Sequence, residues 1–85
     1  MREELKDNRN MRIGYIDKQL NGQITIFDKN GARIGEIRPS GHRLEAMDRT
    51  GRKFAYWDET NDTTFEWNGR RIDKGNLLIP MYFQN

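Results

Sequence analysis

The chain has 85 residues, of which 34% are hydrophobic and 33% charged, and its formal net charge at pH 7 is +2. A chain of this length forms one small domain with a thin core, and the absence of cysteine excludes disulfides and thiolate metal sites. No apolar run approaches the ~20 residues of a membrane span, whereas an aromatic content of 11% favours a folded domain over a disordered one.

The N-terminal segment, residues 1–11, contains no apolar run. Its "REELK" stretch could form one helical turn, but an isolated short helix is marginal in water. We therefore expect an N-terminal arm over 1–11 that need not be ordered, followed by a single domain over 12–85. Because the segment lacks the hydrophobic region of a signal peptide, a cytoplasmic location is the default expectation, unless an upstream leader has been removed.

Two interleaved motifs recur from residue 12 onward. The first is a basic residue followed by a short apolar strand, and its copies are RIGYI (12–16), RIGEI (33–37), KFAYW (53–57) and RIDKG (71–75). The second is a strand ending in an acidic-x-polar-Gly turn, and its copies are ITIFDKNG (24–31), LEAMDRTG (44–51) and TTFEWNG (63–69). Such periodicity indicates repeated supersecondary units. The predicted units are about 12–31, 32–51, 52–69 and 70–85.

The turn residues indicate that each unit is a β-hairpin. The first Asp of "DKNG" or "DRTG" accepts the backbone N–H two residues on, and the final Gly adopts the left-handed conformation. Gly14 and Gly35 fall inside strands, where glycine marks a bulge, a bend or a close backbone approach. Because an isolated hairpin is marginally stable, we predict an all-β domain of four similar hairpins in a compact pseudo-fourfold sheet or shallow barrel.

The wording "GYID", "IFDKNG", "RIGEI" and "AMDRTG" resembles the small bacterial β-hairpin repeat proteins of the four-fold β-flower type, and more weakly the WG-type repeats. The resemblance implies a compact, shallow all-β domain of about this size. It implies no established activity and carries no functional residue over to this chain. The fourth unit departs from the pattern, because "RRIDK" has one apolar residue and Pro80 stops the strand "LLIP". The tail "MYFQN" is therefore a candidate to close or plug one end.

Residues suited to catalysis or metal binding are sparse. His42 is the single histidine and follows a Ser-Gly turn, so it reads as a solvated turn residue, and the nearby Ser40 does not complete a triad with it. Asp28, Asp48 and Glu66 each begin a turn, and hairpin chemistry accounts for them without calcium. We expect a protein that is not an enzyme and that uses no cofactor and no metal.

Charge is unevenly distributed along the chain. Residues 29–53 carry seven basic and three acidic side chains, whereas residues 58–66 carry four acidic side chains and no basic one. One interpretation is an ordinary solvated surface. The other is a dipolar surface that steers a partner or pairs with a second copy of the chain.

The stretch "FAYWDETNDTTFEW" at 54–67 concentrates aromatic residues. We place Phe54, Trp57 and Phe65 in the core, but so small a core cannot bury every aromatic side chain. Some of the remaining aromatics should be exposed, and exposed aromatic clusters indicate interaction sites. The candidate partner-binding residues are Tyr15, Tyr56, Trp67, Arg38, Arg43, Arg49 and Arg52.

These features favour a non-enzymatic protein-binding or self-assembly module whose partner is another protein or a second copy in a homo-oligomer. The alternative is a single-stranded nucleic-acid-binding module that uses the basic 29–53 segment and the exposed aromatics. A net charge of +2 is low for that role. Membrane-surface binding ranks last, because the chain lacks a polybasic run or an amphipathic helix.

Overall fold

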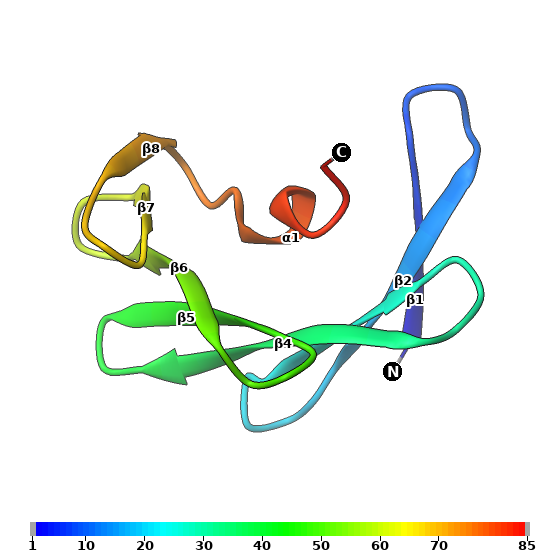
Figure 1. Cartoon of the computed structure of the whole chain (residues 1–85), viewed down its shortest axis with the longest axis horizontal. Coiled ribbons are helices and arrows are strands. Elements are labelled where there is room, and N and C mark those ends of the chain that lie inside the picture. The colour runs from blue at the N-terminus through cyan, green and yellow to red at the C-terminus, as the bar shows by residue number, and fades with distance from the viewer. Residues whose placement is uncertain (1, 85) are drawn as a thin grey trace.

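A computed structural model describes residues 2–84 as one antiparallel sheet of eight strands with one short helix. The strands pair in chain order. The elements are β1 (Arg2–Lys6), β2 (Arg12–Lys18), β3 (Ile24–Asp28), β4 (Arg33–Ser40), β5 (Arg43–Asp48), β6 (Lys53–Asp58), β7 (Thr63–Glu66), β8 (Arg71–Lys74) and α1 (Leu78–Met81). The sheet is strongly curled, and α1 lies in its concavity with β1–β2 and β7–β8 on opposite sides (Figure 1). The predicted all-β class is confirmed.

The sheet is open, which differs from the predicted shallow barrel. Among the described strands, β1 and β8 each have one neighbour, so each leaves one edge unpaired in the sheet. The fourth unit explains the difference, because its second half forms α1 instead of a strand, with Pro80 inside the helical turn. Proline has no N–H to donate to a strand ladder, whereas the first turn of a helix requires no such donor.

The N-terminal segment is more regular than expected. Residues Arg2–Lys6 form a strand that pairs with β2, and not the helical turn that was considered for "REELK". Ion pairs link the two strands, with Glu3 3.3 Å from Lys18 and Glu4 2.7 Å from Arg12. Strand pairing prevails because β2 supplies cross-strand partners that an isolated helical turn would lack.

Five turns share one backbone geometry, in which the first residue accepts an N–H from the fourth residue and donates its own N–H to the fifth. They are 7–11, 19–23, 28–32, 48–52 and 66–70. In the 48–52 turn, Oδ1 of Asp48 accepts the N–H groups of Thr50 and Arg52 at 2.9 and 3.0 Å. Gly51 has a φ of +89°. The predicted roles of Asp and Gly are confirmed in the turns that begin at Asp28 and Asp48.

A β-bulge follows the turns 7–11, 28–32, 48–52 and 66–70, but not 19–23, and explains the repeated "RIG" wording. The strand register shifts once in each of the β1–β2, β3–β4, β5–β6 and β7–β8 pairs. The residues left without a partner opposite are Ile13, Ile34, Phe54 and Ile72. A bulge redirects the extra side chain, and Ile34 and Phe54 pack against the core. In the second and third of these hairpins the bulge therefore turns an apolar side chain inward, whereas Ile72 in the last one remains 37% exposed.

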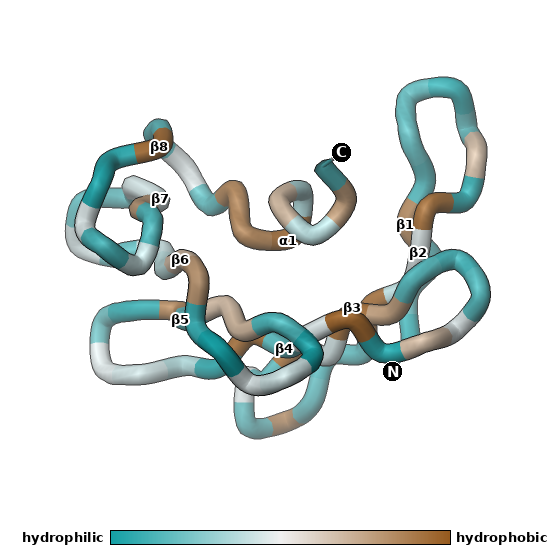
Figure 2. The backbone as a smooth tube through the Cα atoms, viewed as in Figure 1, coloured by the Kyte–Doolittle hydropathy of each residue, from teal (hydrophilic) through white to brown (hydrophobic). Residues whose placement is uncertain are grey.

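The core lies on the concave face of the sheet. Its buried residues are Ile16, Ile26, Ile37, Ala46, Ala55 and Leu78. The strand residues among them alternate with residues of the convex face, as pleating requires. Leu78 enters from α1 and is fully buried. Figure 2 shows α1 as an apolar segment inside the concavity, whereas the hairpin turns are mostly hydrophilic.

The two strand glycines receive aromatic rings from the C-terminal segment. A Cβ atom on Gly14 would lie 2.6 Å from the ring of Phe83, and one on Gly35 would overlap the ring of Tyr82. The Tyr82 hydroxyl bonds to the carbonyl oxygens of Glu36 and Met47, at 2.9 and 2.7 Å. Close approach at these glycines is therefore confirmed, and the tail fills the concave face.

Candidate binding surface

The convex face of β5–β7 carries an aromatic–cation cluster, formed by Arg43, Lys53, Tyr56, Phe65 and Trp67. Tyr56 stacks on Phe65 with ring centroids 5.1 Å apart. Trp67 meets Tyr56 edge-on at 5.8 Å. The strand register explains the grouping, because Tyr56 lies opposite Phe65 and follows Ala55, which faces the core. Three rings thus form a layer on the side of the sheet that α1 does not cover.

Two cations lie over these rings. The guanidinium carbon of Arg43 is 4.0 Å from the centroid of Tyr56, and Nζ of Lys53 is 5.1 Å from that of Trp67. Cation–π contacts at exposed sites contribute about 0.5–1 kcal/mol each, so they hold the side chains in place. Trp67 nevertheless remains 42% exposed. The cluster therefore presents Trp, Tyr and Arg, the residue types enriched at the energetic centres of protein interfaces.

Tyr15 lies at the other end of the convex face, outside the cluster. It is half-buried on β2, with the guanidinium groups of Arg2 and Arg12 at 5.6 and 5.7 Å from its ring centroid. Arg2 is also 4.5 Å from the ring of Phe27. The structure thus forms a second, smaller aromatic–cation group at this end, instead of joining Tyr15 to Tyr56 and Trp67.

Arg38 lies on the convex face above a buried carboxylate. Its Nη2 atom is 3.1 Å from Oε1 of Glu36, and Nη2 of Arg33 is 2.9 Å from the same oxygen. The Glu36 side chain is 9% exposed, whereas those of Arg33 and Arg38 are 41% and 56% exposed. Lys53 stands over Glu45 in the same way. Acidic groups form the lower layer of this surface and cations the upper layer.

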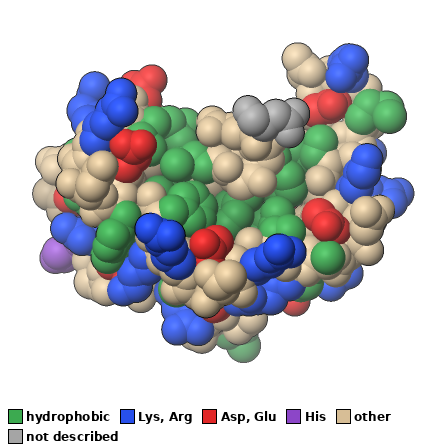
Figure 3. All heavy atoms as spheres, viewed as in Figure 1, with side chains coloured by type: hydrophobic (Ala, Val, Ile, Leu, Met, Phe, Trp, Pro, Cys, Tyr) green, Lys and Arg blue, Asp and Glu red, His purple; other side chains and the backbone are tan. Residues whose placement is uncertain are grey.

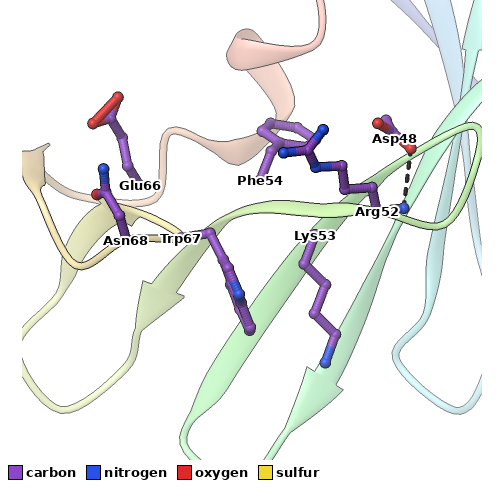
Figure 4. A pocket seen from close by; sticks show the side chains of 7 residues that line it. All are labelled: Asp48, Arg52, Lys53, Phe54, Glu66, Trp67 and Asn68. Atoms are coloured by element: carbon purple, nitrogen blue, oxygen red, sulfur yellow. Dashed lines mark hydrogen bonds between the residues drawn. The ribbon is translucent and has the colours of Figure 1, made fainter.

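Arg49 and Arg52 belong to the 48–52 turn at the rim of the sheet, not to the convex strands. Arg52 lines a shallow notch with side chains of β6 and of the 66–70 turn (Figure 4). In this view Lys53 and Trp67 point to one side of the ribbon, whereas Arg52 and Phe54 point to the other. Asp48 and Glu66 add negative charge to the notch, so it does not extend the positive surface.

Phe65 and Lys53 are members of the cluster that sequence analysis missed. Phe54 and Trp57 pack against the core as predicted, but Phe65 lies on the opposite face, stacked on Tyr56. Spacing contained part of the signal, because residues two apart along a strand share a face, although Trp67 lies just beyond the end of β7. A surface position for Trp67 therefore favoured one for Phe65 as well.

The eight strands separate charge between the two faces. By strand register, the convex positions carry nine basic and five acidic side chains, a net charge of +4. They are Arg2, Lys6, Arg12, Arg33, Arg38, Arg43, Lys53, Arg71 and Lys74, with Glu4, Asp17, Glu36, Glu45 and Asp58. The concave positions carry Lys18 against Glu3, Asp28, Asp48, Glu66 and Asp73, a net charge of −4. Basic and acidic side chains are therefore separated between the two faces of the sheet more than between segments of the chain.

Other kinds of site have little support in residues 2–84. This part of the chain contains no group of three or more His, Cys, Asp or Glu side chains placed to hold a metal ion. None of its helices has the length and apolarity needed to cross a membrane. His42 is exposed in the turn between β4 and β5. Comparison with known protein families, curated proteins and solved structures finds no match to this chain.

Proposed function

We propose that this chain is a non-enzymatic protein-binding module that docks a partner on the aromatic–cation cluster. The observation that carries the proposal is the 42% exposure of Trp67 beside two further aromatic rings. Exposed aromatic patches of this kind are typical of protein contacts. Covering such a patch with a partner removes apolar surface from water, which lowers the free energy. The cysteine-free composition supports a cytoplasmic setting.

The repeated turns and bulges support the likeness to β-hairpin repeat proteins of the four-fold β-flower type. Each bulge precedes a convex strand segment that carries polar and aromatic side chains outward, while the core is shared on the other side. A fold of this kind serves as a rigid platform for a surface. Self-assembly into a homo-oligomer is one form that binding to a protein could take.

The test selects peptides from a random library on the wild-type protein and measures their affinity for two variants. We expect selected peptides to lose about tenfold or more in affinity on Trp67→Ala, because truncating a central interface tryptophan removes over about 1.4 kcal/mol. Leu20→Ala is the matched control, since Leu20 is fully exposed on a distant turn and should bind normally. Equal binding to both variants, or no enriched peptide, would refute the proposal.

The alternative function, single-stranded nucleic-acid binding, is favoured by the net charge of the convex strands. The contacts that the ring of Tyr56 already makes oppose this alternative. Phe65 stacks on Tyr56 and Arg43 lies over the same ring, so these contacts occupy faces that a base would need for stacking. The alternative predicts that oligo(dT) binds at low ionic strength and that its affinity falls steeply with added salt.

A further inference from the structure

The positive charge of the convex face is directed outward near the cluster. The side chains of Glu36 and Glu45 are 9% and 11% exposed, whereas the cations above them, Arg38 and Lys53, are 56% and 44% exposed. At Arg38 and at Lys53, an approaching partner therefore meets the cation before the carboxylate beneath it. In Figure 3, basic and acidic side chains both lie over the outer parts of the molecule, and apolar side chains line the central hollow.

Several acids that balance these cations lie away from the convex face and are already engaged. Oδ1 of Asp28 accepts the N–H groups of Asn30 and Ala32, both at 2.9 Å. Asp48 makes the same bonds within its own turn, and the hydroxyl of Thr50 together with those backbone bonds holds the pKa of Asp48 below its usual value. These carboxylates serve turn geometry and do not cover the convex face, whose net charge of +4 comes from the strands β1, β4 and β8. Within the cluster's own strands, Arg43 and Lys53 stand against Glu45 and Asp58.

We propose that the partner of the aromatic–cation cluster is an acidic polypeptide segment that carries apolar side chains between its carboxylates. The proposal rests on the protein-binding function above and narrows it to one chemistry. Arg43 is oriented by the ring of Tyr56, and an arginine stacked on a ring keeps its planar N–H donors available for a carboxylate. Lys53 supplies a second positive charge beside Trp67, whose exposed surface receives an apolar side chain.

A second copy of the chain does not fit the same role. A two-fold contact brings the same patch of both copies together, and each patch presents the exposed cations Arg43 and Lys53. Like charges at an interface disfavour association and slow the encounter. The covered ring of Tyr56 argues against nucleic acid, as above. An acidic polypeptide satisfies the cations and the exposed tryptophan together.

The experiment measures binding of three fluorescent probes to the full chain by anisotropy, at low and at high salt. The probes are a peptide of repeated Glu-Glu-Leu, its Lys-Lys-Leu counterpart, and oligo(dT). We expect the Glu-Glu-Leu peptide to bind at least about tenfold more tightly than the other two, with an affinity that falls as salt rises. Arg43→Gln and Lys53→Gln should each weaken it by about threefold to tenfold. Lys29→Gln, a cation in the 28–32 turn, is the matched control and should have no effect.

The outcomes separate this inference from the function on which it rests. Equal binding of both peptides, lost in Trp67→Ala, would keep protein binding and overturn the acidic partner. Tighter binding of oligo(dT), lost in Arg43→Gln, would replace both with the nucleic-acid alternative. A dimer by light scattering that dissociates on Arg43→Gln would identify a second copy as the partner. Failure of the Glu-Glu-Leu peptide to bind overturns the inference, whereas peptides selected as above would still support the function.

Discussion

The concave and convex faces of this sheet use the same strands in opposite ways. On the concave face, side chains are removed at Gly14 and Gly35 so that two rings of the tail can lie against the backbone. On the convex face, rings are retained and only cations and one another cover them. The chain completes one face by itself and leaves the other exposed. The first face therefore determines stability, and the second is the surface that we propose for binding.

Among the substitutions that test this comparison, truncating a side chain of the concave core should change stability most. Leu78→Ala should lower the free energy of unfolding by about 3 kcal/mol, because Leu78 is fully buried and its truncation leaves a cavity. Urea denaturation measures the change. Ile72→Ala removes an aliphatic side chain that is 37% exposed on the edge strand β8, and it should cost under about 1 kcal/mol. Equal losses would mean that α1 does not seal the core.

A smaller effect is expected from filling a glycine socket. Gly35→Ala should cost about 2 kcal/mol, because the new methyl group overlaps the Tyr82 ring and the Met47 carbonyl, and overpacking forces the tail to shift. Gly31→Ala is the control, since nothing lies near its Cβ position. Its φ of +87° should cost about 1 kcal/mol for backbone strain alone. Comparable losses of unfolding free energy in the two variants, with the tail amides still protected from hydrogen exchange, would contradict close packing of Tyr82 on Gly35.

The smallest of these effects concerns the Tyr82 hydroxyl. Tyr82→Phe should cost about 1 kcal/mol at neutral pH, because the carbonyl oxygens of Glu36 and Met47 lose a donor. Burial, the main cause, raises the pKa of Tyr82 above its ordinary value of 10.0. The folded state therefore favours the neutral hydroxyl, and this contribution to stability is full below pH 10 and is lost as pH rises further.

Unfolding measured across alkaline pH checks the last point. The wild type should lose stability above pH 10 more steeply than Tyr82→Phe, because the unfolded chain releases the Tyr82 proton first. Parallel curves for the two proteins would show that the hydroxyl is not held by the sheet. Tyr15→Phe, on the convex face, serves as a control for removing a tyrosine hydroxyl elsewhere.

Local sequence signals predicted the parts of the fold that local interactions determine. The turn that begins at Asp48 and closes at Gly51 uses hydrogen bonds within five residues, so its pattern could be recognised directly. Gly35 indicated a close approach, but nothing near it in sequence identified Tyr82 as the neighbour. That contact joins residues 46 positions apart in the hydrogen bond to Glu36, which a periodic pattern does not encode.

The errors have related physical causes. The edge strand β1 was missed because "REELK" has no apolar alternation, and its structure depends on pairing with β2. The open sheet was missed because the fourth unit was treated as a hairpin, although Pro80 favours a helical turn there. In the candidate site, Phe65 was assigned to the core by its hydrophobicity, although it lies opposite Tyr56 on the convex face. Tertiary pairing decided the structure of β1, whereas Pro80 and the spacing of Phe65 from Trp67 were local signals.

The tail that fills the concave face also sets an order of events during synthesis. Each hairpin joins neighbours in sequence and can form soon after its second strand leaves the ribosome. Tyr82 and Phe83, by contrast, contact Gly35 and Gly14, which are made far earlier, and such distant contacts form slowly. Until then the nascent chain presents a string of hairpins with an uncovered apolar side. During this interval the apolar face is accessible to a chaperone, and it stays exposed to solvent if the ribosome stalls.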